Sequence, residues 1–455
     1  LVDALLLAAR PGAAAAGGPL RRVAEALSRL PCWAPPPVGA SVKEWMPKDA
    51  DLDLTVQRRR PREFVGLKNQ GATCYMNAIL QQLFNVRAFR EQLLSIRFGG
   101  RPRCGDRTAE PAGGERDPGV AHDEALQELR LLFAHLHGSD RRAYDAKGFC
   151  KRFTWPGERP VKMSEQQDAQ EFLNRILDLT HERGKHHSSG DGAYAGPEGI
   201  FQGTLSHQTI SLESMHESER EERFYALSLT VRNKANLLES LRLYVKGDTL
   251  DGDNKVRMDG AKGKVSAVKR ACIKVAPPML VFHLKRFYTD FDTMRMVKIN
   301  QHYEFPSDLD MYPFSVDGVE PIERKCVPVP GASGGGGGGG GAAEGDSKAG
   351  AAGPGPGRRP EWRYRLKGVV VHTGQASSGH YFSFIRVGKH GDANANTWAE
   401  FNDQTIRTFN PTDIPKKCFG GTRTVLRTDA RTSQKVKVTR DIIQNAYMLF
   451  YERVQ

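Results

Sequence analysis

At Gly66–Asn77 the chain reads Gly-Leu-Lys-Asn-Gln-Gly-Ala-Thr-Cys-Tyr-Met-Asn, and this stretch decides how its first part folds. A polar, glycine-rich turn brings Cys74 to the first turn of an apolar helix. Unpaired backbone N–H groups at a helix start favour negative charge, so a cysteine there should ionise readily and be more nucleophilic. The stretch predicts a catalytic thiol, and the alternative is a buried structural cysteine.

Two residues of the turn suit an oxyanion site. Gly71 permits a close approach of the backbone, and the side chain of Asn69, five residues before Cys74, can donate an N–H to a developing oxyanion. The alternative for Asn69 is a turn residue that bonds its own backbone. We expect the catalytic role if a matching base lies downstream.

A cysteine nucleophile needs a histidine whose second ring nitrogen is held by a carboxylate or an amide. Of the 13 histidines, His283, His372 and His380 lie in β-type patterns. His283 lies in mid-strand, where a structural histidine is expected. His380 follows Ser377-Ser378-Gly379 and begins a strand, so its ring would be exposed on a rigid support. We expect His380 to be the base, with His372 as the alternative.

Trp398-Ala399-Glu400-Phe401-Asn402-Asp403 follows as a strand that carries an amide and a carboxylate in succession. Adjacent strand residues point to opposite faces, so only one of Asn402 and Asp403 can contact His380 directly. An asparagine would accept from His380 Nδ1–H through its amide oxygen, with less charge assistance than an aspartate. The residues alone leave this choice open.

The order of elements predicts an α+β fold. Ser164-Glu165-Gln166-Gln167 fits a capping box that opens a second helix. From Phe201 onward β-type runs dominate, and they are Met279–Phe287, Tyr364–His372, His380–Val387 and Ala446–Glu452. The front third is expected to be helical and the remainder rich in sheet.

Composition limits the class of protein. The 455 residues include no apolar run near the ~18 residues of a membrane-spanning helix, so we expect a soluble protein with no membrane partner. The formal charge of +13 is dispersed and accompanies no zinc-finger or RNA-recognition motif, which argues against nucleic acid. Seven scattered cysteines predict a reducing compartment, the cytoplasm or nucleus: Cys32, Cys74, Cys104, Cys150, Cys272, Cys326 and Cys418.

Segments of low complexity interrupt the patterned sequence. Residues 1–62, rich in alanine, proline and arginine, predict a partly disordered N-terminal extension. Residues 308–360 predict an insert, which contains eight consecutive glycines at Gly334–Gly341. Because residue 1 is leucine, we expect a piece of a longer chain, and the roles of its flanking regions stay open.

Together these segments resemble the ubiquitin-specific protease family of deubiquitinases. Gly66–Asn77 matches the cysteine box of that family, and Ser378-Gly379-His380-Tyr381 with Trp398–Asp403 matches its histidine box. Further signatures match Gln166-Gln167-Asp168-Ala169-Gln170-Glu171-Phe172 and His283-Leu284-Lys285-Arg286-Phe287. Leu250–Lys255 looks like the fingers region of the large fat-facets-like branch. The resemblance covers residues 63–452, apart from the inserts.

The resemblance implies one catalytic domain at residues 63–452 with a papain-like arrangement. Its parts would be a helical thumb at about 63–185, β-structured fingers at about 200–275 and a palm of antiparallel sheet at about 276–452. Between thumb and palm the tail of ubiquitin would be threaded.

Family positions also imply roles for single residues. Asn402 falls on the third residue of the triad, and Asp403 on a second acidic position that assists. Asp168 falls on a position that contacts the arginines of ubiquitin's tail, and its alternative is a first-turn charge favourable to the helix dipole. Three more residues of the matched signatures are predicted to bind substrate, namely Gln167, Glu171 and Tyr381.

One departure from the family concerns metal. Members of this branch carry two Cys-x-x-Cys pairs in the fingers, which bind structural zinc. Here the first pair falls at Ser211 and Ser214, and the second at about Met258 and Ala261. These are poor zinc ligands, so we predict a degenerate site without metal, and no cofactor elsewhere.

The resemblance implies a thiol hydrolase that cleaves the isopeptide bond after the C-terminal glycine of ubiquitin, with ubiquitin and ubiquitinated proteins as partners. One alternative is a catalytically weak ubiquitin-binding scaffold that kept the fold. Another is a protease for a different ubiquitin-like modifier. Protein substrates, chain linkage preference and oligomeric state stay open.

Overall fold

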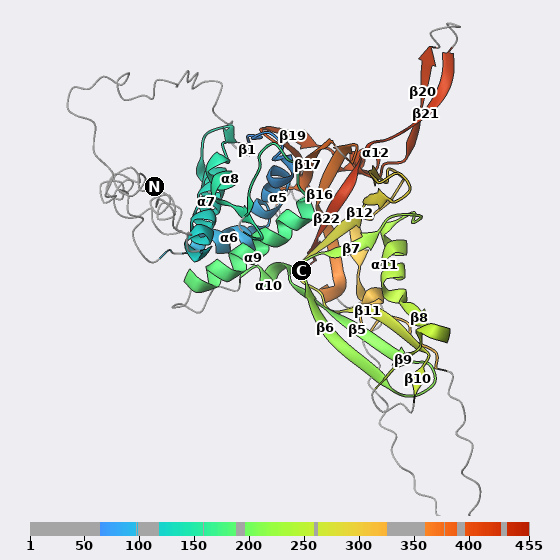
Figure 1. Ribbon diagram of the computed structural model, residues 1–455. Coiled ribbons are helices and arrows are strands. Elements are labelled where there is room, and N and C mark those ends of the chain that lie inside the picture. The colour runs from blue at the N-terminus through green and yellow to red at the C-terminus, as the bar shows by residue number, and fades with distance from the viewer. Residues whose placement is uncertain are drawn as a thin grey trace, which may run out of the picture. The chain divides into compact units, whose positions relative to one another are not determined.

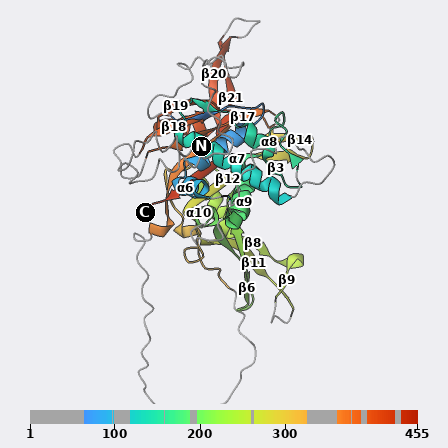
Figure 2. The same cartoon turned by 90° about the vertical axis from the view of Figure 1, so that its left-hand side faces the viewer.

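The computed structural model describes most of the chain, namely residues 64–96, 98, 118–157, 159–187, 196–258, 263–324, 360–376, 378–388, 396–428 and 435–454. The expected N-terminal extension at 1–62 and residues 325–359 of the expected insert lie outside this part. The described chain forms two compact units, whose elements Figures 1 and 2 label. The first unites residues up to Pro197 with His380–Pro411, and the second unites Glu198–Gly379 with the residues from Thr412 onward.

Helices dominate the first unit. All 11 residues of α5 are buried, because α9 and α6 pack against it. Tyr75 of α5 meets Phe172 of α9 edge to face, with ring centroids 5.7 Å apart, and stacks near Trp155. The helices are α5 (Cys74–Phe84), α6 (Arg87–Ser95), α7 (Pro118–Gly138), α8 (Lys147–Arg152) and α9 (Ala169–His187). A helical front segment was predicted, and the structure confirms it.

Helix α9 begins later than the capping box predicted. Residues 163–165 form a turn, and the helix starts at Ala169. Asp168 Oδ1 accepts from the backbone N–H groups of Gln170 at 2.6 Å and Glu171 at 3.3 Å. The prediction of Ser164 as the cap was therefore wrong, because Asp168 satisfies the first free amides of the helix instead.

The strands of the first unit surround the catalytic segments. β17, β18 and β19 form antiparallel pairs in that order, and Ser383 of β17 donates to the carbonyl of Ala78 in α5 at 3.1 Å. Ile385, Ala399 and Phe401 form a small core cluster on these strands. The strands are β1 (Gly66–Leu67), β2 (Ala143–Tyr144), β3 (Thr154–Trp155), β4 (Arg159–Pro160), β17 (Gly379–Arg386), β18 (Trp398–Asn402) and β19 (Thr405–Phe409).

The second unit is rich in sheet, as predicted. One sheet has the order β6-β5-β11-β8, and another path runs β16-β22-β12-β7 with β15 beside β16. The pairs of β22 with β16 and β12 are antiparallel, whereas β7 runs parallel to β12.

Its strands are β5 (Gly203–Ser211), β6 (Glu217–Phe224), β7 (Leu227–Thr230), β8 (Asp248–Leu250), β9 (Val256–Arg257), β10 (Lys264–Val265), β11 (Ala267–Val275), β12 (Met279–Lys285), β13 (Phe287–Asp290), β14 (Arg295–Lys298), β15 (Asp308–Asp310), β16 (Arg363–Gly374), β20 (Thr422–Thr428), β21 (Lys435–Asp441) and β22 (Gln444–Arg453). Its helices are α10 (Glu198–Phe201), α11 (Leu237–Lys246) and α12 (Ile414–Cys418). None of the described helices of either unit is long and apolar enough to cross a membrane.

Residues 308–324 differ from the predicted low-complexity insert. Asp308–Asp310 forms β15, which pairs with β16, and Tyr312–Phe314 forms a 3-10 turn. Leu309, Met311 and Phe314 are buried. Apolar side chains at these positions supply the core contacts that the glycine-rich residues cannot, so the expected start of the insert at 308 was wrong.

The first pair of expected zinc positions lies where β5 ends, at Ser211 and Ser214. Ser214 Oγ lies 2.9 Å from both Ser211 Oγ and His216 Nδ1, and Ser211 Oγ accepts from the Ser214 backbone N–H at 3.1 Å. Met258 packs with Val265 and Ala267, while Ala261 lies outside the described residues. Hydrogen bonds and apolar contacts therefore stabilise the described positions.

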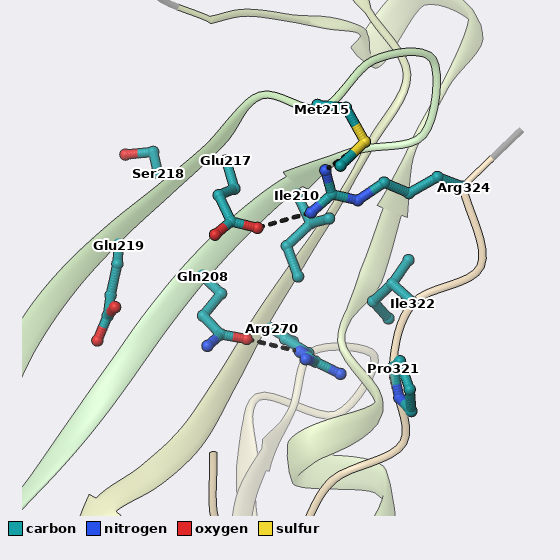
Figure 3. Close-up of a pocket in the computed structure, with 10 residues that line it drawn as sticks. All are labelled: Gln208, Ile210, Met215, Glu217, Ser218, Glu219, Arg270, Pro321, Ile322 and Arg324. Atoms are coloured by element: carbon teal, nitrogen blue, oxygen red, sulfur yellow. Dashed lines mark hydrogen bonds and ion pairs between the residues drawn. The ribbon is translucent and has the colours of Figure 1, made fainter. Parts of the chain in front are cut away.

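One face of the fingers sheet carries a pocket of about 370 Å³ (Figure 3). Residues 321–324 form one wall, and Arg324 pairs with Glu217 of β6 at 2.6 Å. Arg270 of β11 donates to Gln208 of β5 at 2.9 Å. Both cations of this pocket are thus engaged within the lobe, and the pocket belongs to a different unit from Cys74.

Candidate active site

The turn before α5 is held by one side chain. Asn69 Oδ1 accepts from the backbone N–H groups of Gly71 at 3.0 Å and Thr73 at 3.2 Å. Gly71 has a φ of 130°, and a Cβ there would lie 2.5 Å from the carbonyl oxygen of Met163. Only glycine fits this position without strain. The turn delivers Cys74 as the first residue of α5, where the helix N–H groups lack intrahelical acceptors.

His380, the predicted base, lies within hydrogen-bonding distance of Cys74. Its Nε2 lies 2.8 Å from Asn402 Oδ1, and because that oxygen can only accept, Nε2 carries the proton of this bond. Nδ1 is then the ring atom left for the thiol. The prediction that Asn402 would engage Nδ1 was therefore wrong about the nitrogen.

The pKa of His380 reflects this position. The hydrogen bond with Cys74 is the largest cause that raises the pKa of His380 to about 9, against the opposing effect of burial, and the bond to Asn402 and the nearby charge of Asp403 add to it. A raised pKa means that the imidazolium form is stabilised beside the sulfur. A histidine that keeps its proton at neutral pH beside the sulfur is suited to donate that proton to a leaving amine.

Asp403 does not lie in the strand but in the turn after it, with a φ of 50°. Its Oδ1 accepts from Asn77 Nδ2 at 2.8 Å, and its Oδ2 accepts from Asn69 Nδ2 at 2.9 Å. The distance from Oδ2 to His380 Nε2 is 3.9 Å. Asp403 is thus a charged neighbour of the base and the anchor of two asparagines, while Asn402 makes the direct contact.

The side chain of Asn69, predicted as an oxyanion donor, is engaged at both its oxygen and its nitrogen. One N–H of its amide goes to Asp403, which leaves the second N–H for an oxyanion. Gln166 provides another donor, because its Nε2 lies 3.6 Å from Cys74 Sγ. Gln166 and Asn77 lie within the motifs of the sequence, but no catalytic role was predicted for them. A buried asparagine one turn after Cys74 in an apolar helix was the available signal for Asn77.

The predicted substrate-binding residues lie near the start of α9 and on β17. Asp168 caps α9, Gln167 precedes it, and Glu171 lies exposed in the first turn. Tyr381 is buried, and its pKa is raised by burial and by the charges of Asp168 and Cys74. The charges of Asp168 and of the nucleophile therefore both act on one phenol.

His283, the histidine expected in mid-strand, has a structural role. His283 Nδ1 lies 3.1 Å from Ser228 Oγ, and its Nε2 lies 3.0 Å from Tyr447 OH. Both ring nitrogens are engaged, so the prediction of a structural histidine is confirmed. His372 is buried in β16 and belongs to the second unit, whereas Cys74 and His380 belong to the first.

The family model "Ubiquitin carboxyl-terminal hydrolase" matches residues 65–451. The chain belongs to the ubiquitin carboxyl-terminal hydrolase family. Among its relatives, "Ubiquitin carboxyl-terminal hydrolase 9X" of Mus musculus is 35% identical over 425 residues, which are 87% of this chain and 16% of that protein. "Probable ubiquitin carboxyl-terminal hydrolase FAF" of Drosophila melanogaster is 32% identical over 448 residues, 90% of this chain and 15% of that protein.

A third relative is "Ubiquitin carboxyl-terminal hydrolase 24" of Homo sapiens. It is 36% identical over 410 residues, which are 90% of this chain and 14% of that protein. The predicted membership and the fat-facets-like branch are confirmed. The chain spans less than a fifth of the length of these curated relatives.

Among its described residues, no group of three or more His, Cys, Asp or Glu side chains could hold a metal ion.

The raised pKa of His380 predicts the alkaline limb of the pH profile. We expect kcat/KM for hydrolysis of a ubiquitin C-terminal amide to fall as pH rises through about 9, because His380 loses the proton that the leaving amine needs. The stability of the folded chain changes with pH in the same direction. Because folding favours the protonated form of His380, this residue contributes its full stabilisation below pH 6.5, and the contribution is lost as the pH rises through about 9. Steady-state rates between pH 6 and 10 (roughly the range that brackets this limb) measure the midpoint. A midpoint at or below the ordinary pKa of histidine would contradict the raised pKa of His380.

Proposed function

We propose that the chain is a thiol hydrolase that cleaves the isopeptide bond between the C-terminal glycine of ubiquitin and a lysine of a conjugated protein. The observation that carries this proposal is the convergence of Cys74, His380 and Asn402 in one unit, with Nε2 of the base held at 2.8 Å. Membership of the ubiquitin carboxyl-terminal hydrolase family supports ubiquitin as the modifier.

The reaction follows from the placement of these side chains. The Cys74 thiolate attacks the carbonyl carbon of the terminal glycine, and the oxygen takes the negative charge. Asn69, Gln166 and the N–H groups at the start of α5 are the available donors for that oxyanion. As the C–N bond breaks, His380 gives its proton to the lysine amine, and a thioester remains on Cys74.

Hydrolysis of the thioester completes the cycle. Neutral His380 takes a proton from water, the hydroxyl attacks the thioester carbonyl, and ubiquitin leaves with a free carboxylate. The thiolate and the imidazolium are then restored. Asn402 orients the ring in both steps through its bond to Nε2.

We propose that Asp168, Gln167, Glu171 and Tyr381 bind the tail of ubiquitin. The negative charges of half-buried Asp168 and exposed Glu171 suit the arginines of that tail, and carboxylates at the start of α9 are also compatible with its dipole. We further propose the cytoplasm or nucleus as the compartment. The cysteines that the structure describes, Cys74, Cys150, Cys272 and Cys418, are free thiols, which is consistent with reducing conditions.

Labelling with a ubiquitin that carries a C-terminal electrophile tests the proposal. We expect one covalent ubiquitin per chain, seen as a mass increase, and no adduct in Cys74→Ala. Cys150→Ala is the matched control, because Cys150 is another buried thiol of the same unit, and burial raises its pKa to about 11. It should keep the adduct.

Other results of the same experiment identify the alternatives. Ubiquitin binding without an adduct would contradict the enzyme and leave a scaffold. Reaction with the probe of another ubiquitin-like modifier, and not with that of ubiquitin, would change the substrate. A panel of diubiquitins then measures linkage preference.

A further inference from the structure

The first unit has a hollow of its own beside the catalytic turn. Its volume is about 350 Å³, and Lys68, Arg141, Arg142, Asp145 and Gln404 contribute to its wall. The parallel pairing of Gly66 with Ala143 and of Leu67 with Tyr144 brings Lys68 alongside the two arginines. We call this hollow the basic pocket.

The basic pocket adjoins the active site on two segments. Lys68 directly precedes Asn69, and Gln404 directly follows Asp403, and these neighbours are joined by the 2.9 Å bond from Asn69 Nδ2 to Asp403 Oδ2. The wall is tightly built, because a Cβ on Gly66 would lie 2.7 Å from the backbone of Gln404. The pocket therefore lies beside the turn that leads to Cys74 and beside the carboxylate that holds Asn69.

The charge of the pocket is positive. Lys68, Arg141 and Arg142 are exposed, and none of them forms an ion pair with another residue that the structure describes. The carboxylate of Asp145 accepts instead from Gln70 Nε2 at 2.9 Å and from the backbone N–H of Lys147 at 3.0 Å. Three unpaired cations around a cavity are suited to an anionic group.

The substrate has two parts that could place an anion in the pocket, namely the ubiquitin tail and the leaving group on the other side of the scissile bond. The tail of ubiquitin ends in two glycines preceded by arginines, so it has no carboxylate side chain to offer near the bond and is repelled by three cations. The leaving group is the other part of the substrate at this position. An anion in the basic pocket must therefore belong to the protein from which ubiquitin is removed.

We propose that the basic pocket is a leaving-group subsite, which binds aspartate or glutamate side chains next to the ubiquitinated lysine. This inference rests on the proposed function and adds a substrate class to it. The opposite charges of the two sides orient the conjugate: arginines of the tail face the acidic start of α9, and carboxylates of the leaving protein face Lys68, Arg141 and Arg142.

Matched conjugates test the subsite. Ubiquitin is joined through an isopeptide bond to the central lysine of a short peptide, flanked either by glutamates or by the isosteric glutamines. With the intact chain at low salt we expect kcat/KM to be about five- to tenfold higher for the glutamate peptide, as a few exposed ion pairs would give. The ratio should fall toward one at about 0.5 M salt, where screening is strong.

Variants assign the preference to the pocket. In the double variant Arg141→Gln/Arg142→Gln the ratio of the two kcat/KM values should fall to about one to two, and Arg141→Lys/Arg142→Lys should restore most of it. Lys185→Gln is the control, because it removes one exposed cation at the end of α9, outside the pocket. It should leave the ratio unchanged.

The outcomes separate the two proposals. A ratio near one in the intact chain, or an equal ratio in the double variant and in Lys185→Gln, would overturn the subsite and leave the proposed function standing. Failure to cleave either peptide, together with failure to cleave the aminocoumarin amide of ubiquitin, would overturn both.

Discussion

Replacing His380 by glutamine is expected to lower kcat/KM for a ubiquitin C-terminal amide by about 10⁴-fold. Glutamine has a similar reach and can still bond Asn402, but it can neither hold a positive charge beside Cys74 nor transfer a proton to the leaving amine. Both changes raise the free energy of the transition state, because the thiolate loses its counter-ion and the amine leaves without a proton. The change should appear mainly in kcat.

His302→Gln is the matched control for this prediction. His302 is an exposed histidine of the second unit that pairs with Glu304 at 2.9 Å, so the chemical change is the same and the active site is untouched. Its kcat/KM should stay within about twofold of the intact chain, as for a surface substitution. A loss below about tenfold in His380→Gln would show that another group serves as the base.

The second large effect is expected at Asp403. Asp403→Ala should lower kcat by about 10²–10³-fold, which is the usual cost of losing an oxyanion donor. The substitution removes the acceptor that holds Asn69 Nδ2, leaves the amide of Asn77 without its 2.8 Å partner, and takes a negative charge from the neighbourhood of His380. Asp403 is a positioning residue, because it acts through Asn69 and His380.

Two readouts distinguish this role from a general loss of stability. The alkaline limb of the pH profile should move below its midpoint of about 9, since Asp403 is one of the causes that raise the pKa of His380. KM should change less than kcat, because the groups proposed to bind the ubiquitin tail lie elsewhere.

Asp403→Asn should be intermediate, as one carbonyl oxygen can still accept from one asparagine. Asp140→Ala, which removes an exposed carboxylate of the same unit, is the control and should have no effect. An unchanged pH limb in Asp403→Ala would contradict the role.

The elements of the fold were largely predictable where apolar residues recur with a clear period. β12, β16, β17 and β22 lie within a few residues of their predicted ranges, and α5 begins at Cys74, where a helix start was predicted. The errors fell where local patterns compete. Ser164 fits a capping box as well as Asp168 fits a cap, and the choice depends on which oxygen finally meets the free amides of α9. Residues 308–324 looked unpatterned because a three-residue strand is too short to show a period.

The active site likewise has features that the sequence predicts and features that it does not. The residue types and their order determined that Cys74 would start a helix, that His380 would start a strand, and that an amide and a carboxylate would follow it. Only the tertiary structure decided which hydrogen bonds these side chains make. Asn402 binds the ring through Nε2, and Asp403, in a left-handed turn, binds Asn69 and Asn77 from more than 300 positions away in the chain. The physical reason is that a local pattern fixes the direction of a side chain on its own element, whereas a hydrogen bond depends on the packing of distant elements to within a fraction of an ångström.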